Sequence, residues 1–271
     1  MADCAGVNKS KELLALGRVT TLLSYCYRKV MLGYCSGNNK TTHTNALMSL
    51  IRRIETNSSA IRELVKVSID NNSTSYLKLS IGLLLRSCLL DCILGLYLLL
   101  QDEDSVLAEM ERDYVKSLPD RFEVYADREG LSGMDESLLK HIYGLQIEDQ
   151  FCEQIDWSSL KSGFFSIRKE SKLSIKTLFN KLKSDSRLAK LSKKLYAYYK
   201  EYSQYEHFSL YGHRDSLSHY DEDSTSMAKA FQYVCEAMHF IVVRVDVESR
   251  LKLSSYSQHC CIEVLKNIDD K

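Results

Sequence analysis

The sequence predicts an all-α protein, built as a bundle of about eight helices. Proline occurs once, at Pro119, among 271 residues. Proline interrupts helices and is frequent in turns, so its near absence permits long uninterrupted helices. Apolar residues also recur every three or four positions over long segments, which is the spacing of one helix face. A hydrophobic content of 45% is enough to form a large core.

Three long helices are expected in the first hundred residues, over about 9–35, 44–69 and 75–101. Glycine and asparagine in SGNNKTTHTN separate the first from the second, and DNNSTS ends the second. The expected core face of the first helix consists of apolar residues: Leu13, Leu14, Leu16, Val19, Leu22, Leu23 and Tyr27.

The remaining chain is also expected to be helical. Acidic helical segments are expected over about 103–116, 120–129 and 136–155, the last after a capping box from Ser132 to Asp135. A short helix at about 174–185 precedes one at about 186–208, which Asp185 can cap. A long helix at about 224–250 and a short terminal helix complete the list.

The charge distribution is asymmetric although the formal net charge is zero. Residues 101–160 contain sixteen Asp and Glu against five Lys and Arg, whereas residues 161–200 contain twelve Lys and Arg against two acidic residues. One interpretation is that these segments face each other or water. The other is that the basic segment forms a surface that attracts phosphate groups.

The nine cysteines are interpreted as reduced residues of a cytoplasmic protein. They form no C-x-x-C pair, and Cys88 and Cys92 lie in an apolar stretch, so we expect these two in the core. The spacings do not fit a zinc site, and a metal site at His259, Cys260 and Cys261 is the weaker alternative. We expect no cofactor, in particular no haem or flavin.

Residues 81–100 have the length of a membrane span but contain Arg86 and Asp91. Each charge would cost about 2.5–3.5 kcal/mol at the centre of a bilayer. A central helix surrounded by others explains the apolar composition equally well, so no membrane association is expected. Buried in a bundle, the two charges need partners.

A cluster of polar residues follows the stretch of apolar and tyrosine residues that ends near Tyr205. The segment YSQYEHFSLYGHRDSLSHY, residues 202–220, contains three of the seven histidines: His207, His213 and His219. Because the helical spacing continues to Tyr205, we expect Tyr202, Tyr205 and His207 to point toward Arg86. Glycine at position 212 places His213, Arg214 and His219 in a following loop.

Two segments resemble an uncharacterised bacterial family of all-helical domains. SIKTLFNKL followed by LSKKLYAYYKEYSQYEHFS matches a short helix and a tyrosine-rich helix that ends in a Ser-x-x-x-His-x-Ser signature, here Ser203, His207 and Ser209. LLLRSCLLDCILGLYLL resembles the earlier apolar helix of that family, through Arg86, Ser87 and Asp91. The resemblance covers about residues 75–250.

This family is distantly similar to HEPN domains, helical units of which many are metal-independent ribonucleases. The HEPN signature of Arg, a polar residue and a later His is met by RDSLSH, from Arg214 to His219. We expect two parts: residues 1–73, which lie outside the resemblance, as a helical pair packed on the core, and residues 74–271 as a HEPN-like domain. It also implies a homodimer and an RNA-cleaving effector of bacterial defence or a toxin–antitoxin system.

The candidate catalytic residues are Arg86, Asp91, Tyr205, His207, Ser209, Arg214 and His219. A histidine can take the proton of a 2′-hydroxyl, and a guanidinium can stabilise charge on phosphorus. Arg86 and Asp91 lie about 140° apart around a helix, so they do not face one way. The alternative is a non-catalytic scaffold or interaction module in which these residues form a buried polar network.

Overall fold

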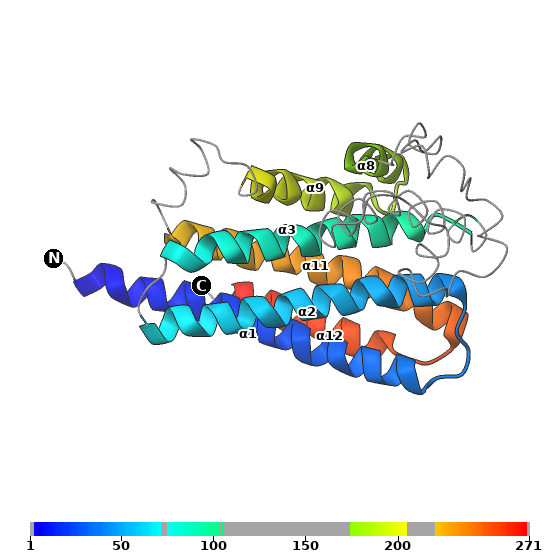
Figure 1. The fold of residues 1–271 in the computed structure, drawn as a ribbon, viewed down its shortest axis with the longest axis horizontal. Helices are drawn as coiled ribbons and strands as arrows, with labels where there is room; N and C mark the ends of the chain where they lie inside the picture. Colours follow the sequence, from blue (N-terminus) through cyan, green and yellow to red (C-terminus); the bar gives the residue numbers. More distant parts are fainter. Residues whose placement is uncertain (1–2, 72–74, 103–104, 106–173, 205–219, 270–271) are drawn as a thin grey trace, which may run out of the picture. The chain divides into compact units, whose positions relative to one another are not determined.

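The computed structural model describes residues 3–71, 75–102, 105, 174–204 and 220–269. These residues contain seven helices and no strand (Figure 1). The helices are α1 (Asp3–Ser36), α2 (Thr42–Asn71), α3 (Ser75–Leu98), α8 (Ile175–Ser184), α9 (Ala189–Ser203), α11 (Tyr220–Ser249) and α12 (Ser254–Asp269). The all-α prediction is therefore confirmed for the described residues, and the count of eight helices stays a prediction.

The breaks after α1 and α2 agree with the turn signals in the sequence, whereas α1 and α11 begin earlier than expected, at Asp3 and Tyr220. The break at SGNNKTTHTN falls between α1 and α2, and α2 ends at Asn71, inside DNNSTS. Asp185 caps the turn before α9, because its Oδ1 accepts hydrogen bonds from the backbone N–H groups of Arg187 and Leu188 at 2.9 and 3.2 Å. The expected acidic helices over 103–155 lie outside the described residues except for Ser105.

Residues 1–103 and 175–271 form one compact unit. Within it, α1 packs against α2, α11 and α12, so the N-terminal pair contributes to the same core as the later helices. The remaining unit, Asp104–Ser174, is described only at Ser105 and Ser174.

The helix α3 lies at the centre of the unit formed by residues 1–103 and 175–271. It contacts α2, α8, α9 and α11. In its last turn Leu94 is half-buried, and the residues from Gly95 to Leu98 are buried. Cys88 and Cys92 are completely buried, as the sequence predicts. Among the described residues, Lys78–Leu98 is the one helical stretch long and apolar enough to cross a membrane. Its packing among four helices accounts for that apolar composition.

Gly95 allows α3 and α11 to approach closely. A Cβ atom built on Gly95 would lie 2.5 Å from Cδ1 and 3.3 Å from Cγ1 of Ile241. We expect Gly95→Val to lower the free energy of unfolding by about 1–3 kcal/mol, because the added methyl groups overfill the contact. Urea denaturation measures this change. Gly17→Val is the matched control, since a Cβ there meets only Val65 Cγ1 at 3.3 Å, and an equal loss in both variants would contradict the packing argument.

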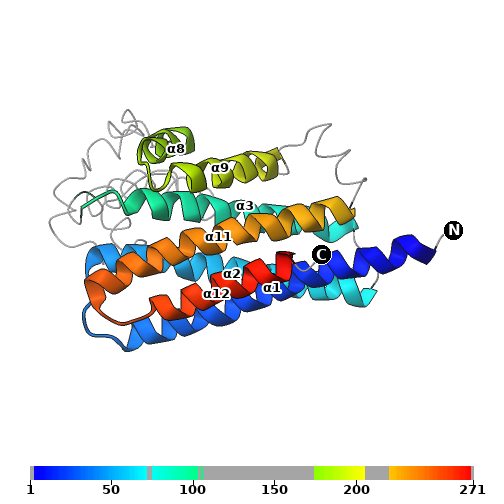
Figure 2. The ribbon, with the colours of Figure 1, turned by 180° about the vertical axis from the view of Figure 1, so that it is seen from behind.

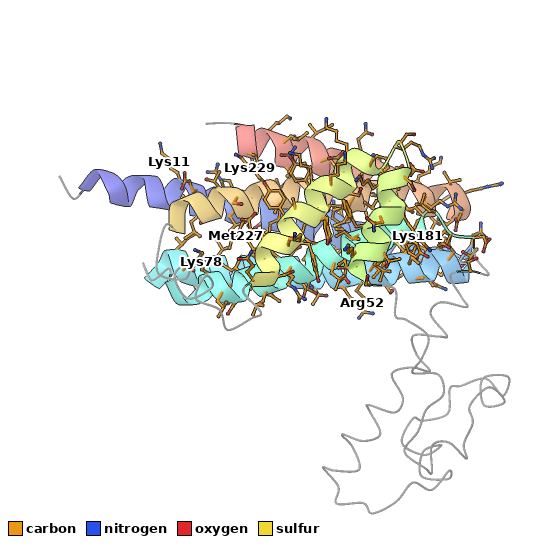
Figure 3. All side chains as sticks on the ribbon, turned by 90° about the horizontal axis from the view of Figure 1, so that it is seen from above. Lys11, Arg52, Lys78, Lys181, Met227 and Lys229 are labelled. Carbon is orange, nitrogen blue, oxygen red and sulfur yellow. The ribbon has the colours of Figure 1, made fainter. Side chains whose placement is uncertain are left out.

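The helices α8 and α9 cover one side of α3, and Figure 3 looks down onto them. The sequence predicts an apolar and tyrosine stripe on this helix. Leu188, Leu191, Leu195 and Tyr202 are buried, Tyr198 is half-buried, and Tyr205 lies outside the described residues. For the helix expected at 224–250, the helical spacing predicts a core face, and all its members are buried in α11: Met227, Phe231, Val234, Met238, Ile241 and Val245. These two stripes place α9 beside both α3 and α11.

On α1 the predicted core face is only partly right. Leu13, Leu16, Val19, Leu23 and Tyr27 are buried, but Leu14 is 41% exposed. Leu14 and Leu22 instead line an open hollow of about 620 Å³ beside α2. The apolar stretch of α1 is therefore wider than the face that α2, α11 and α12 cover.

A tight connection joins α11 to α12. The carboxylate of Asp246 accepts backbone hydrogen bonds from Leu253 and Ser254, both at 2.6 Å. Arg250 and Lys252 have φ values of 61° and 58°, in the left-handed region that non-glycine residues rarely adopt. The turn lays α12 along α11 and α1, as Figure 2 shows from behind.

Candidate functional site

Arg86 extends from α3 toward α9. Its Nε donates a hydrogen bond to Ser203 Oγ at 3.3 Å, and its Nη2 donates to the Tyr199 hydroxyl at 3.4 Å. The guanidinium carbon also lies 5.4 Å from the centroid of the Tyr199 ring, within cation–π range. Arg86 is half-buried, so its charge is held in place while remaining partly open to solvent.

Stacked aromatic rings support the Tyr199 side of this contact. The rings of Phe179 and Tyr196 stack with centroids 4.2 Å apart, and Tyr196 and Tyr199 follow at 6.4 Å. The row connects α8 to α9 on the side that faces Arg86. A row of stacked rings restricts the rotamers of each member, so it orients the Tyr199 hydroxyl. Sequence reasoning missed Tyr199, although its position one turn before Ser203 was readable from the helical spacing.

Ser203, the partner of Arg86, belongs to the Ser-x-x-x-His-x-Ser pattern in the sequence. Its hydroxyl donates to the Tyr199 carbonyl at 2.6 Å and accepts from Arg86. Ser203 is the first residue of the Ser-x-x-x-His-x-Ser pattern and the last residue of α9. The pattern therefore begins in contact with Arg86.

Five candidate residues, Tyr205, His207, Ser209, Arg214 and His219, lie outside the described residues. The predicted approach of Tyr205 and His207 to Arg86 stays a prediction. Tyr202 is described, and its side chain is buried as expected. Its hydroxyl donates a hydrogen bond to Ser226 Oγ on α11 at 3.5 Å.

Asp91 lies on a different side of α3 and contacts α2. Arg53 Nη2 is 3.0 Å from Asp91 Oδ1, and the Arg53 side chain is 58% exposed while that of Asp91 is 1% exposed. Neither carboxylate oxygen accepts a well-formed hydrogen bond from the described residues. Burial raises the pKa of Asp91 from 3.8 to about 6, and the nearby Arg53 charge opposes this rise.

The described contacts of Arg86 are therefore with α9, whereas Asp91 contacts Arg53 on α2. Each has a separate partner, as expected from the angle between them on the helix. Sequence reasoning missed Arg53, because a single arginine on an amphipathic helix gives no signal of its tertiary neighbour. The position of Arg53 one residue before the buried Ile54 places it at the edge of the core.

A small polar hollow opens between α2 and α3. It has a volume of about 270 Å³ and is lined by Arg52, Arg53, Thr56, Asn57 and Ser87. Arg52 and Arg53 supply two guanidinium groups, and Thr56, Asn57 and Ser87 supply donors that suit an oxyanion. The buried carboxylate of Asp91 next to Arg53 weakens the positive potential on one side of this hollow.

The helices α8 and α9 form a strongly basic surface. All lysine and arginine side chains of residues 174–204 are exposed, whereas that segment has only two acidic residues, Asp185 and Glu201. The basic residues are Lys176, Lys181, Lys183, Arg187, Lys190, Lys193, Lys194 and Lys200. We call these eight residues the α8–α9 basic surface. It lies on the elements that also hold Tyr199 and Ser203 against Arg86.

Comparison of the chain with protein-family models, with curated proteins and with solved structures finds no match. The relation to HEPN domains therefore rests on the quoted residues alone.

Proposed function

We propose that this protein is a nucleic-acid-directed effector that cleaves RNA without a metal ion, in a bacterial defence or toxin–antitoxin context. The proposal includes a HEPN-like arrangement of α3, α9 and α11 and a homodimer of two such chains. The observation that carries it is the α8–α9 basic surface beside Arg86, whose guanidinium is oriented by Tyr199 and Ser203.

The exposed cations support RNA as the ligand. A sequence-independent attraction to the phosphate backbone comes from clustered Lys and Arg side chains, and it is the main source of non-specific affinity. Eight exposed cations on two adjacent helices provide such a cluster. The same segment has only two acidic residues, so its net charge stays positive and attracts phosphate groups. Tyrosine rings beside them offer faces on which unpaired bases can stack.

The proposed chemistry divides between His207 and Arg86. His207 takes the proton of a ribose 2′-hydroxyl, and the 2′-oxygen attacks the adjacent phosphorus. The bond from phosphorus to the 5′-oxygen breaks, leaving a 2′,3′-cyclic phosphate, and the 5′-oxygen receives a proton from a protonated histidine. Arg86 stabilises the negative charge that develops on the phosphoryl oxygens. Tyr205, Ser209, Arg214 and His219 are the further candidates to bind the phosphate or supply the proton.

One observation favours the alternative of a non-catalytic scaffold. Arg86 already has hydrogen-bond partners on α9, and a half-buried arginine that joins two helices can serve to fix their pairing. Under this alternative, the contact with Ser203 and Tyr199 determines where α9 sits on α3. The two functions differ in whether the protein binds and cleaves RNA.

We expect reversal of three charges on α9 to weaken RNA binding. In the variant Lys190→Glu/Lys193→Glu/Lys194→Glu, the exposed side chains lie on one helix face at spacings of three and four residues. The affinity for a fluorescein-labelled single-stranded RNA should fall about tenfold or more at low salt. The slope of log K against log salt concentration should become shallower by about 2, since each lost phosphate contact removes about 0.7. Fluorescence anisotropy over a salt series measures both.

The matched control reverses three exposed cations on α1, in Lys11→Glu/Arg18→Glu/Arg28→Glu. This variant has the same change in net charge, and α1 lies away from α9 in Figures 1 and 2. The control should retain the affinity of the unmodified protein within about threefold. Equal weakening in both variants would show that only net charge matters, and absence of RNA binding at low salt would remove the proposed function.

A further inference from the structure

Four cysteines from three helices meet in the part of the bundle where α1, α11 and α12 pack together. Cys26 comes from α1, Cys235 from α11, and Cys260 and Cys261 from α12. These three helices contact one another pairwise. The sequence showed only the adjacent pair Cys260–Cys261, because Cys26 and Cys235 are brought to it by tertiary packing alone.

The sulfur atoms are in direct contact. Sγ of Cys235 lies 3.4 Å from Sγ of Cys261, and the Cys261 thiol also lies 3.5 Å from the Cys235 carbonyl oxygen. Cys26 and Cys235 also act on Cys260, because both lower the pKa of its thiol. The Tyr27 hydroxyl donates to the Cys235 carbonyl at 3.3 Å, which fixes the backbone of α11 at this point.

The four thiols have different access to solvent. Cys26, Cys235 and Cys260 are buried, whereas Cys261 is only half-buried. A small oxidant therefore reaches Cys261 first and finds Cys235 directly behind it. The seven cysteines from Cys26 onward whose side chains the structure describes are all free thiols.

The electrostatics of the cluster favour one ionised sulfur. Hydrogen bonds from Cys235 and then Cys26 lower the pKa of Cys260 to about 5, against the effect of burial. The same contacts raise the pKa of Cys26 and Cys235, with burial adding to the rise. The negative charge of the cluster is therefore expected on Cys260, while Cys26 and Cys235 stay protonated.

We propose that Cys235 and Cys261 are a peroxide-sensitive thiol pair that closes to a disulfide between α11 and α12. The Cys261 sulfur attacks hydrogen peroxide, the O–O bond breaks, and Cys261 becomes a sulfenic acid while one water leaves. The Cys235 sulfur then displaces the hydroxyl group, which leaves as a second water with the remaining thiol proton. In total, two thiols and one peroxide give one disulfide and two waters.

Geometry selects this pair over the others. A disulfide requires the two sulfur atoms to approach from 3.4 Å to about 2.05 Å. The adjacent residues Cys260 and Cys261 are a poor pair, because neighbouring Cα atoms lie about 3.8 Å apart and disulfides usually join Cα atoms about 4.4–6.8 Å apart. Cys26 and Cys260 are in contact, but both are buried.

A metal ion is the other ligand that four cysteines suggest. Among the described residues, however, no group of three or more His, Cys, Asp or Glu side chains is arranged to hold one. Cys235 and Cys261 instead form a pair with their sulfur atoms 3.4 Å apart, and a pair is what disulfide formation needs.

The test uses the full chain in a background of Cys4→Ser/Cys35→Ser/Cys152→Ser, which leaves six cysteines. After treatment with hydrogen peroxide, intact mass under denaturing conditions should fall by about 2 Da, and alkylation should count two thiols fewer. Dithiothreitol should restore both values. In this background, a further Cys261→Ser or Cys235→Ser substitution should abolish the loss of mass. With a further Cys26→Ser or Cys260→Ser substitution, the loss of mass should still occur.

Circular dichroism of each variant before oxidation shows that the fold is kept. Cys261→Ala serves as a second variant at the half-buried position, and it should behave as Cys261→Ser does. A disulfide that survives Cys261→Ser, or a stable mass gain from sulfinic acid in place of the loss, would overturn the proposal. So would stoichiometric zinc in the purified protein that is lost in both the Cys235 and the Cys261 variants.

Discussion

Replacing His207 with alanine is expected to lower the rate of RNA cleavage by about 10²–10⁴-fold, the contribution of a general base. His207 follows Ser203 by four residues, and Ser203 accepts a hydrogen bond from Arg86 at the end of α9. One further helical turn would bring His207 to the same face as Ser203. The measurement is single-turnover cleavage of a labelled RNA by the purified protein in the presence of a chelator, with thermal unfolding recorded in parallel.

The matched control is His219→Ala, which removes the histidine of the Arg214–His219 motif. Cleavage should persist in this control. Cleavage that survives His207→Ala and disappears in His219→Ala would identify His219 as the base instead. A variant His207→Ala with unchanged activity and a loss of about 1–3 kcal/mol in the free energy of unfolding would support the scaffold alternative.

Arg86→Lys tests the other half of the proposed mechanism. Lysine keeps the positive charge but cannot reproduce the planar set of donors that reaches Ser203 and Tyr199 together. Cleavage should fall while the affinity for RNA changes little, because the α8–α9 basic surface remains. A parallel loss of affinity would place the role of Arg86 in binding.

Replacing Asp91 with asparagine is expected to stabilise the protein at pH 7. Burial raises the pKa of Asp91 from 3.8 to about 6, so desolvation of the carboxylate outweighs its attraction to Arg53. This difference in the pKa of Asp91 between the unfolded and the folded protein corresponds to a destabilisation of at most about 3 kcal/mol at pH 7. Because the asparagine amide also needs partners, we expect a gain of about 1–3 kcal/mol in the free energy of unfolding.

The pH dependence has a definite sign. The folded protein holds the Asp91 proton more tightly than the unfolded chain, so this group favours folding at low pH. Its contribution is fully present below about pH 3.8 and is lost as the pH rises through about 6. The advantage of Asp91→Asn should therefore shrink below about 1 kcal/mol at pH 4. Urea denaturation of both proteins at pH 4 and pH 7 measures the difference.

Arg53→Gln is the paired variant, because it removes the charge that faces the buried carboxylate. It should destabilise the protein at pH 7 and have a smaller effect at pH 4, where Asp91 is protonated. Combining it with Asp91→Asn should remove most of that loss, since the two residues interact directly. A destabilising Asp91→Asn at pH 7 would show that the ion pair outweighs the cost of burial.

The helical elements and their core faces could be predicted from the sequence. A buried stripe such as Leu188, Leu191 and Leu195 repeats at the helical period, and that period is a local property of the chain. Turn signals have the same local origin, as the capping of α9 by Asp185 illustrates. The exposure of Leu14 shows where this reasoning fails, because periodicity does not say how wide a face the neighbouring helices cover.

The sequence by itself determined that the described chain is helical, where the turns after α1 and α2 fall, and that Arg86 and Asp91 need partners. Only the tertiary structure decided which partners they have: Ser203 and Tyr199 for Arg86, and Arg53 for Asp91. It also decided that Cys26 and Cys235 join Cys260 and Cys261. The physical reason is that helix formation depends on neighbours a few residues apart, whereas these contacts join side chains far apart in the chain. Which of them meet is fixed by how the apolar faces of α1, α3, α9, α11 and α12 pack together.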